Sequence, residues 1–148
     1  MSIKEKISSL GLSLPTAAAP VAAYVPAVKS CNLIFTAGQL PVVDGKLLKE
    51  GKVGREVTAE EAKEFAQICA LNALAAISLV ADLDQIERVV RVGGFVNCAP
   101  GFTAIPGVIN GASEFLIKIF GDVNGKQDRK STRLNSSHMP VSRMPSSA

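Results

Sequence analysis

The sequence predicts an α+β protein in which helices cover one face of a mixed sheet. Three observations support this fold class: two segments with apolar residues at helical spacing, a long Val-rich segment between them, and an early pair of short apolar segments joined by a turn. The resulting order is helix, hairpin, helix, strand, helix. Because a sheet covered on one side leaves its other face open, we expect another copy of the chain to bury that face.

The N-terminal third is predicted to contain a short helix followed by two hairpins. The helix spans 2–10 and ends at Gly11, a residue that accepts the left-handed conformation common after a helix. Two short strands follow at 21–29 and 33–41. The dipeptide Asp44-Gly45 then predicts the tight turn of a second hairpin.

The two long helices and the strand between them carry local signals of their own. The sequence Thr-Ala-Glu-Glu that begins at Thr58 is a capping box, which indicates a helix start. A strand is predicted at 86–97, with a bulge at Gly93-Gly94. The last helix begins near Pro106 and ends at Gly121. Its apolar face is expected to comprise Val108, Ala112, Phe115, Leu116 and Ile119.

Charge and hydropathy argue against two classes of partner. The formal net charge is +3, but 128–148 holds four basic residues and one acidic residue, which leaves 1–127 neutral. A nucleic-acid-binding surface is therefore not supported. No apolar segment reaches the ~20 residues that span a bilayer, and the N-terminus lacks the apolar run of a signal peptide. We expect a cytoplasmic protein without membrane contact.

The cysteines and the histidine indicate neither a disulfide framework nor a metal site. Cys31, Cys69 and Cys98 are odd in number and far apart, and the only histidine is His138. We expect buried free thiols in a reducing compartment, and no metal.

Four segments carry a resemblance to a known family. They are AAYVPAVKSCNLIFTAGQLPVVDGKL (22–47), RVVRVGGFVNCAPGF (88–102), VINGASEFLIKIFG (108–121) and IFGDVNGK (119–126). A strand, a short link and then TAGQLP is a specific combination, and IFGDVNGK strengthens it. On the evidence of these segments the chain resembles the Rid family (RidA/YjgF-like), and the resemblance extends over almost all of 1–127.

The resemblance implies a chorismate-mutase-like fold, a homotrimer and ligand pockets between the subunits. Enzymatic members of the family are enamine/imine deaminases, which hydrolyse intermediates such as 2-aminoacrylate to a keto acid and ammonia without a metal or organic cofactor. The alternative function is that of a non-enzymatic, regulatory trimer that binds a small carboxylate metabolite or a protein partner.

The resemblance also assigns residues to a ligand pocket. Tyr24 matches the aromatic residue that lines the pocket, Gly38 the backbone position that approaches the ligand, and Asn110 an asparagine of the last helix. Ala37 stands where a hydroxyl residue is common, which removes one hydrogen bond to the ligand. Arg129 matches the arginine that binds the substrate carboxylate, and it is the catalytic candidate. From residue types alone, the simpler interpretations are a half-buried strand tyrosine and a surface or capping asparagine.

Residues 128–148 differ in character from the rest of the chain. DRKSTRLNSSH (128–138) shows neither helical nor strand periodicity, and Asp-Arg-Lys-Ser can be encoded by the first codons of a common sequencing adapter. We therefore predict an incomplete Rid-like domain at 1–127, with the final strands of the fold missing, and a non-native, disordered tail at 128–148. Arg129 would then match the family by coincidence, and the chain as written would be inactive.

Overall fold

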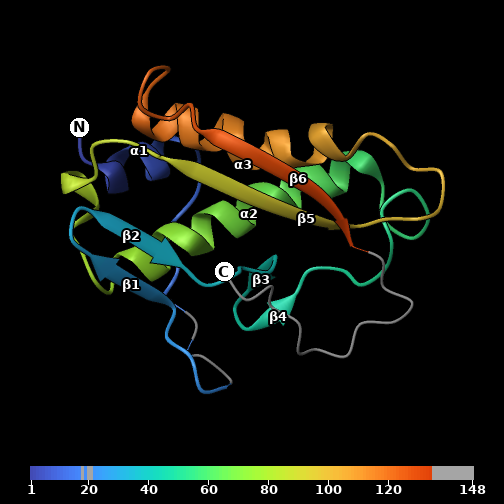
Figure 1. Ribbon diagram of the computed structural model, residues 1–148, viewed down its shortest axis with the longest axis horizontal. Coiled ribbons are helices and arrows are strands. Elements are labelled where there is room, and N and C mark those ends of the chain that lie inside the picture. Colours follow the sequence, from blue (N-terminus) through green and yellow to red (C-terminus); the bar gives the residue numbers. More distant parts are fainter. Residues whose placement is uncertain (18, 20–21, 135–148) are drawn as a thin grey trace.

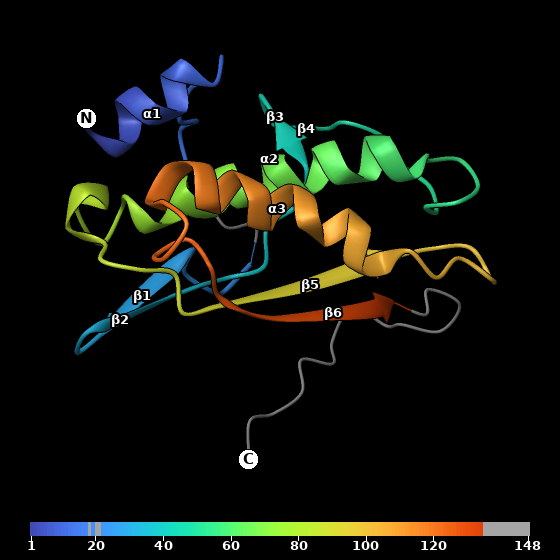
Figure 2. The ribbon, with the colours of Figure 1, turned by 90° about the horizontal axis from the view of Figure 1, so that it is seen from above.

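The structure is a computed structural model that describes residues 1–17, 19 and 22–134 (Figure 1). Its helices are α1 (Ile3–Ser9), α2 (Ala59–Ile77), the short 3-10 helix η1 (Leu83–Gln85) and α3 (Ile105–Phe120). Its strands are β1 (Ala27–Ser30), β2 (Leu33–Thr36), β3 (Val42–Val43), β4 (Lys46–Leu47), β5 (Arg91–Asn97) and β6 (Asp128–Leu134). The hairpin β1–β2 and the pair β5–β6 lie on the same side of α2 and α3 (Figure 2).

The strands confirm the mixed character of the predicted sheet, but they are divided into three pairs. β1–β2 and β3–β4 are antiparallel, whereas β5–β6 is parallel. Together with the helices packed on one side, this arrangement confirms the α+β class.

Both predicted hairpins are present, and their turns use the residues that the sequence indicated. Cys31 (φ 51°) lies in the turn between β1 and β2. Asp44 (φ 50°) and Gly45 (φ 77°) both have positive φ between β3 and β4, as a two-residue type I′ turn requires. The second hairpin is fixed to α2 because Asn72 Nδ2 donates to the carbonyls of Leu40 and Val42, each at 3.0 Å.

The helix starts and stops follow the local signals. At the start of α2, Glu61 N donates to Thr58 Oγ1 at 3.1 Å, and Thr58 N donates to Glu61 Oε2 at 2.9 Å, so the predicted capping box is confirmed. α3 ends before Gly121, whose φ is 90°. The five predicted apolar positions of α3 are all buried.

α2 and α3 pack against each other at Gly111. A Cβ at this position would lie 1.8 Å from the carbonyl oxygen of Lys63 on α2, so only glycine allows this approach. α1 closes the other side of the core: Ile7 is fully buried, and Lys6 Nζ donates to the Ile119 carbonyl at the C-terminus of α3 at 3.0 Å.

β5 is regular, so the predicted bulge at Gly93-Gly94 is wrong. Its register with β6 is unbroken from Arg91 opposite Asp128 to Asn97 opposite Leu134. Gly94 has a different role, because a Cβ there would lie 2.3 Å from Ile109 Cδ1. The glycine therefore lets α3 pack closely on the strand.

The prediction of a disordered tail is wrong for its first seven residues. Asp128–Leu134 forms β6 and is paired with β5 along its whole length. The segment lacks apolar alternation, but the backbone groups of β5 supply its hydrogen bonds whatever its side chains are. The predicted boundary at residue 127 thus does not separate folded from unfolded chain. Residues 135–148 lie outside the described part, and the adapter origin of the tail stays a prediction.

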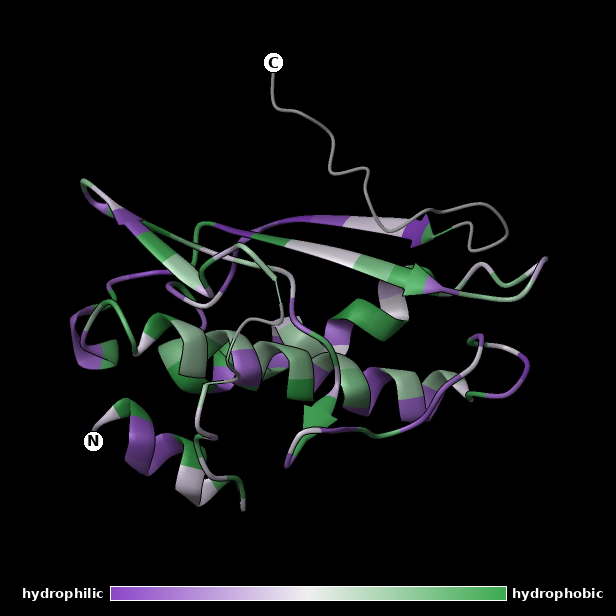
Figure 3. Cartoon of the chain, turned by 90° about the horizontal axis from the view of Figure 1, so that it is seen from below, coloured by the Kyte–Doolittle hydropathy of each residue, from purple (hydrophilic) through white to green (hydrophobic). Residues whose placement is uncertain are grey.

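Hydrophobic residues lie along the β1–β2 hairpin and β5 (Figure 3), and several of them are exposed. Val28 and Phe35 are opposite each other in the β1–β2 hairpin and are 49% and 58% exposed, and Phe95 of β5 is 65% exposed. Gly94 and Val96 point toward the helices, so the strand alternation directs Phe95 outward. The described residues therefore leave one sheet face uncovered.

Candidate functional site

Two of the predicted site residues, Arg129 and Asn110, are in direct contact. Arg129 lies opposite Val92 near the start of β6, and its side chain points toward α3. Its Nη1 donates to Asn110 Oδ1 at 2.6 Å and to Ser113 Oγ at 3.2 Å. Asn110 and Ser113 are three residues apart on α3 and therefore share one face of the helix. All three side chains are half-buried.

Gln127 supports this contact from the residue before β6. Its Nε2 donates to Ser113 Oγ at 2.7 Å, so the Ser113 hydroxyl accepts from both Gln127 and Arg129. Gln127 Oε1 is buried and makes no hydrogen bond to any described residue. The hydrogen bond to Ser113 is therefore the contact that fixes the Gln127 amide.

The guanidinium of Arg129 is held by neutral groups only. Within residues 1–17, 19 and 22–134, no carboxylate forms an ion pair with it; the neighbouring Asp128 lies 3.9 Å from Arg91 instead. An arginine has five N–H donors, and two of the five are engaged here. The positive charge and the edge formed by Nε and Nη2 are left for another acceptor.

The basic residues of β6 do not form one patch. Arg129 points toward α3, and Arg133, on the same side of the strand, donates from Nη2 to the Ala99 carbonyl. Lys130 is exposed on the opposite face. Although 128–134 is folded, its charges are thus divided between two faces.

The other predicted site residues lie at the β1–β2 hairpin. Tyr24 is 47% exposed in the segment before β1. Ala37 follows β2 and donates its N–H to the Pro26 carbonyl at 2.9 Å. Gly38 is exposed, with open space where a Cβ would be. In the part of the chain that the structure describes, no hydrogen bond joins these residues to Arg129 or Asn110.

Two residues of this contact, Ser113 and Gln127, were not predicted from the sequence. The signal for Ser113 was its spacing of three residues from Asn110 within a predicted helix, which places both on one face. Gln127 is two residues before Arg129, and in extended chain that spacing places two side chains on the same side. The spacing of Gln127 and Arg129 is informative only if 128–134 is predicted to be a strand.

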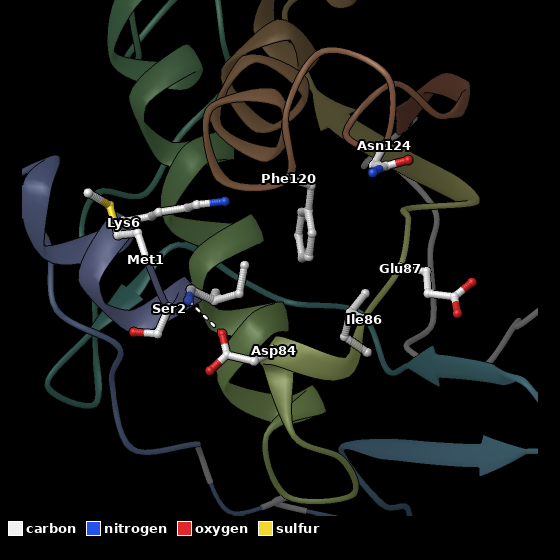
Figure 4. Close-up of a pocket in the computed structure, with 9 residues that line it drawn as sticks. Met1, Ser2, Lys6, Asp84, Ile86, Glu87, Phe120 and Asn124 are labelled. Atoms are coloured by element: carbon white, nitrogen blue, oxygen red, sulfur yellow. Dashed lines mark hydrogen bonds between the residues drawn. The ribbon is translucent and has the colours of Figure 1, made fainter.

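A separate pocket of about 450 Å³ lies between α1, η1 and the end of α3 (Figure 4). Asp84 Oδ1 accepts from Ile3 N at 2.7 Å, and Lys6 Nζ is engaged by the Ile119 carbonyl. The remaining charged side chain that lines this pocket, Glu87, is acidic. The pocket is therefore lined by charges of both signs, from Lys6 and the amino terminus of Met1 on one side and from Asp84 and Glu87 on the other, and these give no preference for an anionic ligand.

Among the described residues, the thiols and the acidic side chains indicate no metal centre. Cys98 is buried, and burial raises the pKa of Cys69 to about 12, which keeps this thiol protonated. Cys31 is exposed, so the expectation that all three thiols are buried is wrong for it. No group of three His, Cys, Asp or Glu side chains within the described residues is arranged to hold a metal ion. Nor is any described helix both long and apolar enough to cross a membrane.

The fold and the site define a chorismate-mutase-like α+β protein with an arginine held on a helix face. The family described as "YjgF/chorismate_mutase-like, putative endoribonuclease" matches residues 4–144. The chain therefore belongs to the YjgF/Rid-like family.

Relatives from three organisms agree with this assignment. Protein TCP17 of Trypanosoma cruzi is 36% identical over 128 residues, which are 86% of this chain and 80% of the relative. The crystal structure of Atu1372 from Agrobacterium tumefaciens, a protein of unknown function, is 37% identical, with a TM-score of 0.80 over 89% of this chain and 81% of that chain. A "putative endoribonuclease" from Shewanella oneidensis MR-1 is 29% identical, with a TM-score of 0.87 over 95% and 92%.

Proposed function

We propose that the chain carries a Rid-type site that binds a small 2-imino or 2-keto carboxylate at Arg129. The observation that carries this proposal is the half-buried guanidinium, which Asn110 and Ser113 orient without neutralising it. The planar edge of Nε and Nη2 matches the two oxygens of a carboxylate. One guanidinium with its Nε–Nη2 edge available suits a small ligand with a single carboxylate better than a long nucleic acid.

The chemistry that such a site supports is hydrolysis of an enamine or imine. 2-Aminoacrylate first tautomerises to the imine. Water then adds to the imine carbon, so that a C–O bond forms and the nitrogen takes up a proton. Loss of ammonia breaks the C–N bond, and the hydroxyl releases its proton to give pyruvate. The site must hold the carboxylate and orient the water, and the proposal requires no cofactor.

Turnover also needs a group that handles the attacking water. Among the described residues, no Asp or Glu side chain forms a hydrogen bond or an ion pair with Arg129, Asn110 or Ser113. We therefore expect this chain to bind a keto acid but to hydrolyse 2-aminoacrylate no faster than background. The alternative function, a non-enzymatic carboxylate-binding protein, would behave in the same way.

A comparison of two chains separates these functions. The first is the protein as it stands, and the second carries the residues of a full-length relative after Gln127. Pyruvate binding is measured by titration calorimetry, and hydrolysis is measured with 2-aminoacrylate generated in solution. We expect both chains to bind and only the second to hydrolyse. Binding without turnover in the second chain, over several amino-acid-derived imines, would favour the non-enzymatic alternative. RNA cleavage by either chain would contradict both proposals.

The role of the arginine is tested by Arg129→Met. This variant should weaken pyruvate binding by roughly tenfold or more, because it removes charge-assisted hydrogen bonds to the carboxylate. Lys130→Met is the matched control, since it makes the same change in charge one residue away on the opposite face. Equal affinities of the two variants would exclude Arg129 as the carboxylate-binding residue.

We further propose that the working form is a cytoplasmic homotrimer. The exposed apolar residues of the sheet support an assembly. Tyr24, Ala37 and Gly38 lie at the β1–β2 hairpin and make no hydrogen bond to Arg129 within the described part of one chain. Contact between neighbouring copies would bring the hairpin residues of one copy to the Arg129 of another. We therefore keep all five residues as candidates for the ligand pocket.

A further inference from the structure

Arg129 is held at one end of its guanidinium, and both groups that hold it are uncharged. Its Nη1 makes hydrogen bonds to Asn110 Oδ1 (2.6 Å) and Ser113 Oγ (3.2 Å), and no other hydrogen bond from Arg129 is present within the described residues. A carboxylate in either place would hold the guanidinium equally well but would also neutralise it. Because Asn110 and Ser113 are uncharged, they hold the guanidinium in place without neutralising its positive charge.

We propose that Ser113, fixed by Gln127, is a positioning residue that aims the Nε–Nη2 edge of Arg129 at a ligand carboxylate. This inference rests on the function proposed above and adds to it a residue pair that directs the arginine. A serine hydroxyl rotates freely unless a second group restrains it. Gln127 Nε2, 2.7 Å from Ser113 Oγ, occupies one acceptor direction and leaves another to Arg129.

The placement of Gln127 supports the same conclusion. Among the described residues its buried Oε1 has no hydrogen-bond partner, so the bond from Nε2 to Ser113 Oγ is the contact that orients the amide. Ser113 is one helical turn from Asn110, and both residues accept from the same nitrogen, Nη1. Two contacts to one nitrogen fix the rotation of the guanidinium plane, whereas a single contact would leave it free.

The experiment measures pyruvate affinity and Arg129 side-chain mobility in the full chain. Affinity comes from titration calorimetry, and mobility comes from ¹⁵N relaxation of the Arg129 Nε–H group without ligand. Ser113→Ala should weaken pyruvate binding by roughly three- to tenfold, the equivalent of one hydrogen bond, and should increase the mobility. Ser113→Thr keeps the hydroxyl and should restore both values.

Two further variants separate positioning from general stability and from charge. Ser9→Ala removes an exposed helix hydroxyl in α1 and should change neither readout. Asn110→Asp keeps an oxygen acceptor for Arg129 but adds a negative charge, so pyruvate affinity should fall roughly tenfold while thermal stability is retained. Unchanged affinity in Asn110→Asp would overturn the requirement for neutral acceptors.

The outcomes distinguish this inference from the function on which it rests. If wild type binds pyruvate and Ser113→Ala binds it within about twofold, the positioning role is wrong and the proposed function stands. If wild type does not bind pyruvate, the proposed function is wrong. The comparison of Arg129 mobility between wild type and Ser113→Ala then decides whether Ser113 restrains the arginine. Unchanged Arg129 mobility in Ser113→Ala overturns the inference in either case.

Discussion

At the residue scale, Gly111 determines how closely the two long helices approach. The backbone of α3 at Gly111 meets the Lys63 carbonyl of α2, and this contact cannot open without moving one helix. Gly111 also lies next to Asn110, which holds Arg129. The packing of the helix pair and the position of the site therefore depend on the same turn of α3.

Gly111→Ala is expected to destabilise the protein by about 1–3 kcal/mol, the usual cost of overpacking. The added Cβ would lie 1.8 Å from backbone oxygen, so a helix must move. The measurement is the free energy of unfolding in urea. Gly107→Ala is the matched control, because it makes the same change in the same helix with nothing within 4 Å of the new Cβ. It should leave stability unchanged or raise it by about 0.5–1 kcal/mol. Equal destabilisation by both variants would contradict the close contact.

At the element scale, the turn that leads into α2 depends on Glu56. Its side chain accepts from Arg55 Nε at 2.6 Å and from Lys52 N at 2.8 Å, and these bonds hold 52–57 in a tight turn just before Thr58. The hydrogen bond from Arg55, followed by that from the Lys52 backbone, lowers the pKa of Glu56 from 4.5 to about 2. The ionised carboxylate is thus favoured by folding.

This shift predicts a pH dependence of stability. Because the folded pKa is the lower one, the contribution of Glu56 is fully present above about pH 4.5 and is lost as pH falls toward 2. As the pH is lowered from 4.5 to 2, the urea midpoint of Glu56→Gln should therefore fall less than the urea midpoint of wild type. Glu64→Gln, at an exposed position on α2, serves as the control and should keep the wild-type decrease. An unchanged pH profile in Glu56→Gln would show that the turn contacts do not bind the carboxylate in solution.

Elements with local signals could be predicted from the sequence, whereas β6 could not. The Thr58 capping box, the Asp44-Gly45 turn and the stop at Gly121 are each set by a few neighbouring residues, and all three are confirmed. β6 is polar and pairs in parallel with a strand more than thirty residues away, so its own residues do not indicate it. Asn110 and Arg129 could be expected from the family resemblance, but Ser113 and Gln127 required the position of β6 against α3.

At the scale of the whole molecule, the helices cover one face of the strands, and the part of the chain that the structure describes leaves the other face uncovered. The helices lie on one side of β5 (Figure 2), and Val96 on that side is buried, whereas Val28, Phe35 and Phe95 are exposed. An apolar face of this kind is typical of an interaction surface. Burial of a phenylalanine side chain stabilises a complex by about 1.5–3 kcal/mol. Phe95 of each copy would therefore contribute substantially to the stability of an assembly.

Phe95→Arg is therefore expected to dissociate the assembly. Sedimentation equilibrium should give three times the chain mass of 15.5 kDa for wild type and the single-chain mass for the variant. A buried guanidinium without a partner is strongly unfavourable, and three symmetry-related copies would also repel one another. Val123→Arg is the control: Val123 is 78% exposed in the turn after α3, outside the sheet face, so its mass should stay that of wild type. A monomeric wild type would remove the trimer proposal, whereas an associated Phe95→Arg variant would place the contact on another surface.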